Sequence, residues 1–184
     1  MATRFRQGAG RLSLDFVRTL RFRGTDHTIE ELPDLAAVTA WIEQCVPHVE
    51  GPAGATGAAE ARTVREAIHE MVTAAWRGER IPATVRDVVN GAAARPVPAP
   101  HMDAEGDVRW QADDLVSAVL AVLSRDVLEL VASPHLARLR QCAGTDCSAL
   151  FLDLSRPGRR RWCSMDHCGN RAKKETLRRR AGRP

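Results

Sequence analysis

The sequence predicts a mainly α fold: a helical N-terminal domain with one short β-hairpin, followed by a small module that contains four cysteines. Apolar residues recur at helical spacing through most of residues 12–132. Prolines interrupt this pattern between residues 95 and 111. Four of the five cysteines then fall within residues 142–168, in two pairs of equal spacing. These changes of pattern divide the 184 residues into two predicted domains, 1–133 and 134–184.

Four helices are predicted before the proline-rich segment. They cover residues 12–20, 34–46, 59–77 and 82–91. Gly91 is expected to end the fourth helix, because glycine is frequent just after a helix. The polar segment from residue 21 to Leu32 and the Gly/Pro-containing residues 51–57 are predicted to be loops.

Residues 95–111 predict a short, poorly paired β-hairpin. Three prolines at alternate positions exclude a helix in the first part of this segment. Charged and apolar residues then alternate over residues 107–110, after a turn at residues 105–107.

The longest apolar pattern runs from Asp113 to about Ala132. Its apolar face is broad, which predicts a central and mostly buried helix. The longest apolar stretch, Leu115 to Leu123, is interrupted by Ser117 and is too short to cross a bilayer. The N-terminus lacks the apolar segment of a signal peptide. We therefore expect a soluble, cytoplasmic protein without a membrane partner.

Charge is distributed unevenly between the two predicted domains. Residues 1–133 carry a net charge of −5 and residues 134–184 a net charge of +9, which together give the formal charge of +4. A basic segment of this kind favours a polyanionic partner. In a reducing compartment, paired cysteines are more often metal ligands than disulfides. The isolated Cys45 is interpreted as a small core residue.

The cysteine pairs predict a metal site. Cys142 and Cys147 are followed, after fifteen residues, by Cys163 and Cys168. Short spacings let one turn supply two thiolates, and four thiolates complete the tetrahedron that Zn²⁺ prefers. Four free thiols or a redox site are the alternatives, and His167 is an alternative fourth ligand.

The residues around the cysteines predict a treble-clef-like four-cysteine zinc finger. Leu150–Leu152 is expected to be a strand and residues 156–159 a type II turn. Residues 160–162 are then expected to return as the second strand. Ser164 is expected to cap a helix that runs to Arg180. A closed site of four sulfur ligands has no open position for water, which argues against zinc catalysis.

A dense set of basic residues surrounds the second cysteine pair. We predict that these residues contact nucleic acid, chiefly DNA phosphates, and they are Arg159, Arg160, Arg161, Arg171, Lys173, Lys174, Arg178, Arg179, Arg180 and Arg183. Arg171 and Asn170 are also candidates for contacts with base edges. The alternative is a solvated helix face, with Asn170 and Arg171 in structural roles. Trp162 is interpreted as a cover for the small core of the finger.

Three sequence segments resemble the CGNR-type zinc finger, which is named for the four residues that stand here at 168–171. They are Phe151-Leu-Asp-Leu-Ser155, Arg160-Arg-Trp-Cys-Ser-Met165 and Cys168-Gly-Asn-Arg171-Ala-Lys173. In that family the finger follows a helical domain called ABATE, and the proteins are regarded as bacterial stress-related transcription regulators. The segment Leu14-Asp-Phe-Val-Arg-Thr19 matches the expected Leu-Asp-Phe-x-Asn-Thr signature except at Arg18.

These observations lead to three hypotheses of function. The first is a zinc-dependent DNA-binding transcription regulator, in which a small-molecule effector binds a candidate pocket formed by Asp15, Arg18, Arg65 and His69. The second is a protein- or RNA-interaction module in which zinc is purely structural. The third, an enzyme, is disfavoured because the sequence has no nucleophile elbow, phosphate loop or open metal triad. A homodimer is compatible with the first two.

Overall fold

The structure of the chain is a computed structural model that describes residues 5–181, and the side chains of residues 5–178. The α-helices are α1 Leu12–Val17, α2 Leu35–Cys45, α3 Ala58–Arg77, α4 Ala83–Ala93, α5 Leu115–Ala132 and α6 Asn170–Ala181. A 3-10 helix, η1 Pro134–Arg138, and a π-helical turn, η2 Met165–Gly169, complete them. The strands are β1 Leu20–Arg21, β2 Ile29–Glu30, β3 Val49–Glu50, β4 Ala99–Met102, β5 Val108–Gln111, β6 Leu139–Gln141 and β7 Leu150–Leu152. The predicted mainly α fold is confirmed.

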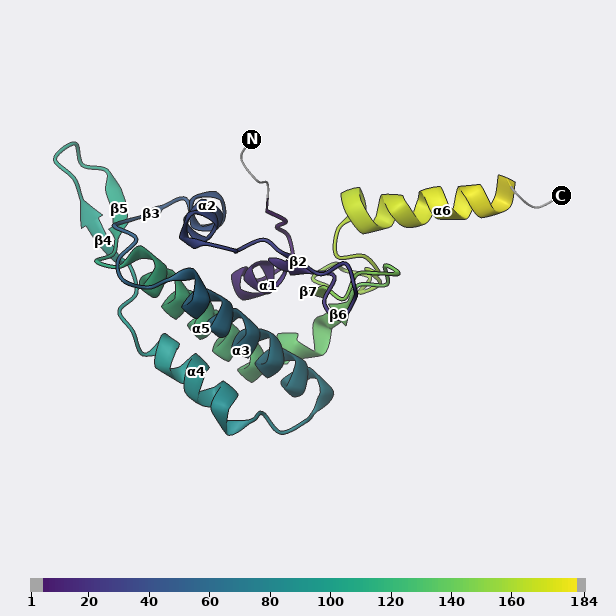
Figure 1. The fold of residues 1–184 in the computed structure, drawn as a ribbon, viewed down its shortest axis with the longest axis horizontal. Coiled ribbons are helices and arrows are strands. Elements are labelled where there is room, and N and C mark those ends of the chain that lie inside the picture. The colour runs from purple at the N-terminus through teal and green to yellow at the C-terminus, as the bar shows by residue number, and fades with distance from the viewer. Residues whose placement is uncertain (1–4, 182–184) are drawn as a thin grey trace.

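Helix α5 is the centre of the helical domain, as its broad apolar face predicts, and α1, α2, α3 and α4 pack around it (Figure 1). Asp114 caps its N-terminus by accepting a hydrogen bond from the N–H of Ser117 at 2.9 Å. The same carboxylate accepts one from the hydroxyl of Thr56, also at 2.9 Å, and so ties the loop before α3 to the start of α5. Phe16 and Trp41 meet edge to face in the core, with ring centroids 5.0 Å apart.

The predicted end of α4 is wrong, because the helix continues through Gly91 to Ala93. A glycine ends a helix when it adopts a positive φ, and Gly91 does not. Gly78 does so after α3, where its φ is 69° and its N–H donates to the carbonyl oxygen of Ala75. The segment before Pro96 ends α4 instead, since proline restricts the residue that precedes it.

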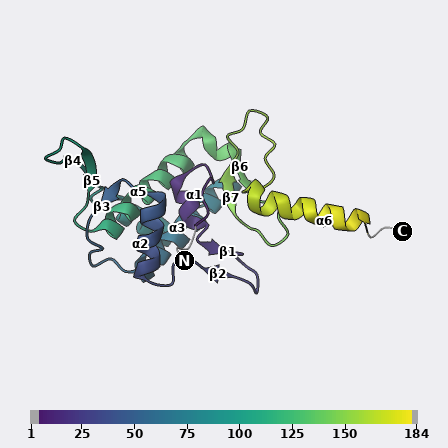
Figure 2. The same cartoon turned by 90° about the horizontal axis from the view of Figure 1, so that it is seen from above.

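The strands form three small sheets. The predicted hairpin is confirmed as β4 and β5, with four residue pairs rather than poor pairing, and β3 adds to β5 in parallel. It lies at one end of the molecule in both views (Figures 1 and 2). The expected loop after α1 contains a second hairpin, β1–β2. Two residue pairs are too few to give a recognisable alternation in the sequence.

The finger and the helical domain share one hydrophobic core. Leu139, Phe151 and Leu152 from β6 and β7 are buried in the same cluster as the helices. Residues 5–11, which we call the N-terminal arm, lie against β7, where the N–H of Leu152 donates to the carbonyl oxygen of Ala9 at 2.8 Å. The predicted boundary at residue 133 thus separates two parts that pack together.

Helix α6 leaves this body and projects away from it, opposite to the β4–β5 hairpin (Figures 1 and 2). Twelve residues at 1.5 Å per residue make it about 18 Å long. Within residues 5–181, no helix is long and apolar enough to cross a membrane.

Candidate metal centre and basic helix

The first cysteine pair lies on a tight loop between the paired strands β6 and β7. The N–H of Cys142 donates to the carbonyl oxygen of Ala149 at 2.9 Å, and that of Cys147 to the carbonyl oxygen of Gly144 at 3.1 Å. A Cβ atom on Gly144 would lie 3.2 Å from the Cβ of Cys147 and 3.4 Å from the Sγ of Cys168. Glycine therefore leaves room for four sulfur atoms to gather there.

The strand predicted at residues 160–162 is wrong. The partner of β7 is β6, which precedes the first cysteine pair. Asp153 organises the intervening loop instead, since its carboxylate accepts hydrogen bonds from the N–H groups of Ser155 and Arg160. The predicted turn closes one residue early, between Ser155 and Gly158. Residues 160–162 return to the cysteine loop without forming a strand, and the N–H of Ala143 donates to the carbonyl oxygen of Arg161.

The second cysteine pair lies at the start of the last helix, as predicted. The side chain of Ser164 makes no capping hydrogen bond, but its carbonyl oxygen accepts from the N–H of Gly169 at 3.0 Å. This bond spans five residues and makes the wide turn η2. Cys168 lies within that turn and is buried, as is Cys163, which precedes Ser164.

The four cysteine sulfur atoms converge, and all lie within 4.8 Å of one another. The Sγ of Cys163 is 3.7 Å from the Sγ atoms of both Cys147 and Cys168. In a tetrahedron with metal–sulfur bonds of about 2.3 Å, neighbouring sulfur atoms are about 3.8 Å apart. The cluster therefore has the donor set and the size of a four-thiolate metal site.

Hydrogen bonds at the cluster favour a thiolate at Cys142. The side chains of Cys147 and Cys163 lower the pKa of the Cys142 thiol, and the N–H of Cys163 also donates to its Sγ at 3.3 Å. A deprotonated sulfur is the form that binds a metal. The chain itself thus prepares at least one of the four ligands.

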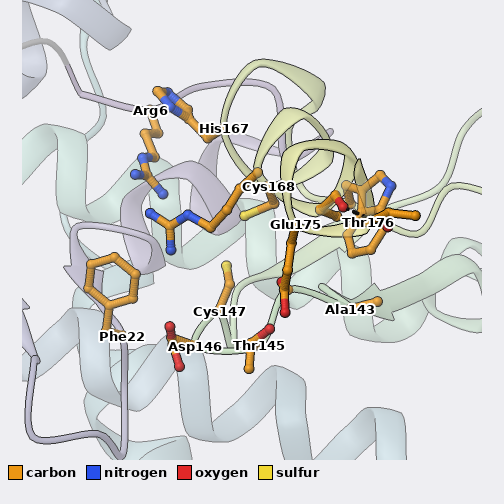
Figure 3. Close-up of a pocket in the computed structure, with 14 residues that line it drawn as sticks. Arg6, Phe22, Ala143, Thr145, Asp146, Cys147, His167, Cys168, Glu175 and Thr176 are labelled. Carbon is orange, nitrogen blue, oxygen red and sulfur yellow. Dashed lines mark hydrogen bonds between the residues drawn. The ribbon is translucent and has the colours of Figure 1, made fainter. Parts of the chain in front are cut away.

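His167, the alternative ligand, is not part of this group in the described part of the chain. Its side chain is exposed and lies beside Arg6 (Figure 3). Burial and the nearby charges of Arg6 and Arg21 lower the pKa of His167. The cysteines Cys142, Cys147, Cys163 and Cys168 are therefore the complete predicted ligand set.

The predicted nucleic-acid residues on α6 are exposed. Arg171, Lys173, Lys174 and Arg178 face solvent, and none of them forms an ion pair within residues 5–178. The side chains of Arg179 and Arg180 lie outside the described side chains, and Arg183 lies outside the described residues. Exposed Asn170 begins the helix.

The three predicted arginines before the second cysteine pair differ in their surroundings. Arg159 is exposed, and its side chain makes no hydrogen bond or ion pair among residues 5–178. The guanidinium of Arg161 lies 5.0 Å from the centre of the Trp162 ring. Arg160 instead donates to the carbonyl oxygens of Trp162, Gly8 and Cys163. Its guanidinium also lies 4.6 Å from the ring centre of Phe151. These contacts point to a structural role for Arg160.

Two of the predicted pocket residues, Asp15 and Arg18, hold the N-terminal arm. The carboxylate of Asp15 accepts from the N–H of Ala9 at 2.8 Å and from that of Gly8 at 3.2 Å. The buried Arg18 donates to Asp15 and to the carbonyl oxygen of Gln7. The contacts of both residues favour a role in packing over a role in binding a ligand.

The other two predicted pocket residues lie on α3. Arg65 is only 1% exposed, and its guanidinium is bound by Glu30, Glu66 and the hydroxyl of Thr19. His69 lines a hollow together with Arg18, but the hollow has a volume of about 20 Å³, close to that of one water molecule. Burial lowers the pKa of His69 to about 4, so it is neutral at pH 7.

A larger cleft of about 220 Å³ lies between the body and α6 (Figure 3). Arg6 from the arm, Phe22 from the β1–β2 turn, Asp146 beside Cys147, and His167 line it. Phe22 adopts a φ of 55°, the only positive value of a non-glycine residue in the described chain. Sequence reasoning missed Arg6 and Phe22, because neither belongs to a motif and the fold alone brings them to the same cleft as residues of α6.

Comparison with known proteins agrees with this architecture. The ABATE family model, described as "Putative stress-induced transcription regulator", matches residues 10–134. The CGNR zinc finger model matches residues 138–181, which include all four clustered cysteines. Among the curated proteins, none matches this chain significantly. Because the first match covers more than half of the sequence, the chain belongs to the ABATE family and carries a CGNR zinc finger after the ABATE domain.

Proposed function

We propose that this protein is a zinc-dependent DNA-binding transcription regulator. The observation that carries the proposal is α6, a basic helix that projects from the body and directly follows the turn η2, which holds Cys168 of the metal site. Helix α6 contains six Lys or Arg residues and one Glu. An isolated helix of this length gains little from its own hydrogen bonds in water. We therefore infer that α6 contacts a binding partner.

The size and charge of α6 fit duplex DNA. An α-helix with its side chains is about 10–12 Å wide, and the major groove of B-DNA is about 12 Å wide. We assign phosphate contacts to the exposed Lys173, Lys174 and Arg178, and a contact with a base edge to Arg171, near the N-terminal end of α6. We assign the structural role to Arg160, and therefore no DNA contact to it.

We propose zinc as the metal. The four sulfur donors at tetrahedral spacing suit Zn²⁺, which needs no further ligand in a structural site. When bound, zinc would fix η2 and the cysteine loop relative to each other, and so aim α6. A closed site of this kind offers no position for a substrate, so we propose no enzymatic activity.

The alternative is a protein- or RNA-interaction module with the same metal site. The exposed arginines of α6 would suit an acidic protein surface or single-stranded RNA as well. The contacts of Asp15, Arg18 and Arg65 give these residues a role in packing. They therefore do not help to choose between a DNA-binding regulator and an interaction module. A small-molecule effector and a homodimer stay predictions.

Fluorescence anisotropy with a random-sequence DNA duplex at several salt concentrations tests the proposal. Each phosphate contact adds about −0.9 to the slope of log K against log salt. Replacing Arg178, Arg179 and Arg180 by Ala should therefore flatten the slope by up to about three units. The control variant replaces Arg77, Arg80 and Arg86, which are exposed around the α3–α4 connection, away from α6 in Figure 1.

The control should bind as the wild type does, although it loses the same charge. If the zinc-loaded wild type binds duplex DNA without salt dependence, or not at all at about 50 mM salt, the proposal fails. Tighter binding to single-stranded RNA than to duplex DNA would favour the interaction module.

A further inference from the structure

A basic groove runs between the N-terminal arm and α6. Arg6 lines one side of this open groove of about 440 Å³, and His167, Arg171, Lys174 and Arg178 line the other. The last four residues are separated by four, three and four positions, so they lie on one face of η2 and α6. The groove thus joins cationic side chains from two segments that are far apart in the sequence.

Arg6 differs from the other arginines near it in its ionic contacts. Arg11, Arg18, Arg21 and Arg23 each form an ion pair with a carboxylate. Among residues 5–178, no carboxylate forms an ion pair with Arg6. Burial and the charge of Arg21 lower the pKa of its guanidinium, and the opposing effects of Cys163, Cys168 and Glu31 offset this only in part. An external anion in the groove would relieve this unfavourable clustering of positive charge.

The arm holds Arg6 in place on both sides. Before it, the N–H of Phe5 donates to the side chain of Gln44 at 2.9 Å, and the amide of Gln44 donates back to the carbonyl oxygen of Phe5 at 2.8 Å. After it, the carboxylate of Asp15 binds the N–H groups of Gly8 and Ala9. Arg6 therefore reaches the groove from a fixed backbone, which lowers the entropy cost of binding an anion.

We propose that this groove takes one phosphodiester strand of duplex DNA, and that Arg6 binds a phosphate from the ABATE side while α6 lies against the same strand. This inference rests on the proposed function. From Arg171 to Arg178 the cations follow about 10 Å of helix axis, which suits an extended polyanion better than a single small anion. Asp166 and Glu175 also line the groove and disfavour a compact, multiply charged ligand.

The inference gives the helical domain a direct part in DNA binding. Arg6 depends on Asp15 for the position of its segment, and Asp15 belongs to α1, which packs on α5. A change in the packing of α1 would therefore move a DNA contact without touching the finger.

Arg6→Ala in the full-length, zinc-loaded protein tests the inference, with Arg80→Ala as the matched control. Arg80 is exposed beyond the end of α3 and has no ion pair within residues 5–178. Anisotropy with a random-sequence duplex should give a slope of log K against log salt that is flatter by about 0.9 for Arg6→Ala and unchanged for Arg80→Ala. Arg6→Lys should restore most of the slope, since it keeps a point charge at the same place.

The outcomes separate this inference from the proposed function. A wild-type slope in Arg6→Ala, with a flattened slope in Arg178→Ala, would remove Arg6 from the interface and leave the regulator intact. If the wild-type protein does not bind DNA, both the inference on Arg6 and the proposed function fail. A thermal stabilisation by inorganic phosphate that Arg6→Ala abolishes, together with an unchanged DNA slope, would assign the groove to a small anion and overturn the inference.

Discussion

The guanidinium of Arg65 makes two hydrogen bonds of 2.6 Å to the two carboxylate oxygens of Glu30, and so joins α3 to β2. Arg65 is almost fully buried, whereas the side chain of Glu30 is 30% exposed. A buried guanidinium that lost this carboxylate would retain Glu66 as its only ionic partner among residues 5–178. The pair is thus an electrostatic link within the helical domain.

The Arg65–Glu30 pair predicts a pH-dependent stability. Burial raises the pKa of Glu30, but the hydrogen bonds and charge of Arg65 lower it by more, so it lies below its ordinary value. A depressed carboxylate pKa gives stability that is present above the unfolded-state pKa of about 4.3 and is lost as pH falls through the folded-state pKa. Glu30→Gln should therefore lower the free energy of unfolding by about 1–3 kcal/mol at pH 7, and by much less below about pH 4.

Urea unfolding of both proteins, followed by circular dichroism from neutral to acidic pH, measures this difference. Comparing the two proteins at each pH cancels any change at the metal site that both share. Glu79→Gln is the control, because Glu79 is exposed just after α3. A Glu30→Gln effect that stays constant into the acid range would contradict the assigned role of the pair.

The metal site predicts different behaviour for the two kinds of cysteine. Cys142→Ser removes one ligand of the cluster, whereas Cys45→Ser changes the cysteine that lies outside it, on α2. Elemental analysis should find about one zinc per chain in the wild type and in Cys45→Ser, and much less in Cys142→Ser. Structural zinc contributes about 10–16 kcal/mol to folding of small fingers, so the finger should unfold in Cys142→Ser.

The shared core extends this prediction to the helical domain. Phe151 and Leu152 from the finger pack with the helices, so loss of the metal should also lower the melting temperature of α1–α5 without abolishing their fold. Circular dichroism melts with and without a chelator would show this. An unchanged melt of the helical domain after zinc removal would mean that the finger adds nothing to its stability.

Gly91 offers a stabilising substitution. It lies inside α4, is exposed, and would place a Cβ atom in open space, with nothing within 4 Å. Alanine is favoured over glycine within a helix by about 1 kcal/mol, so Gly91→Ala should raise the free energy of unfolding by up to that amount. Gly78→Ala should do the reverse, because Gly78 has a φ of 69°. If urea unfolding gives equal changes in the free energy of unfolding for the two substitutions, Gly91 does not lie inside a helix as the structure has it.

The sequence could predict the parts of this fold that depend on near neighbours. Helical spacing and an N-terminal cap were sufficient for α2 and α5, and the equal spacing of the cysteines was sufficient for the metal cluster. The contact of Leu152 with Ala9 joins residues more than 140 positions apart, and no periodicity records it. For the same reason the basic residues around the finger looked alike in the sequence, although Arg160 reaches back to Gly8.

Arg159 and Arg160 are adjacent in the sequence, and the structure predicts opposite consequences for their removal. Arg160→Ala would leave the carbonyl oxygens of Trp162 and Cys163 without their guanidinium partner and remove the stacking on Phe151. We expect it to lower the stability of the finger by about 2–3 kcal/mol and to speed zinc loss to a chelator. Arg159→Ala removes an exposed side chain and should change stability by less than about 0.5 kcal/mol.

The DNA measurements should show the converse pattern. Arg159→Ala should flatten the slope of log K against log salt by up to about 0.9, because the sequence predicts that its guanidinium contacts a phosphate. Zinc-loaded Arg160→Ala should keep the wild-type slope. In the wild type the guanidinium of Arg160 already donates to the carbonyl oxygens of Gly8 in the arm and Cys163 in the finger, so we expect it to make no phosphate contact. A flattened slope in zinc-loaded Arg160→Ala with unchanged stability would show that Arg160 turns outward to DNA, and that the contacts of the free protein are exchanged on binding.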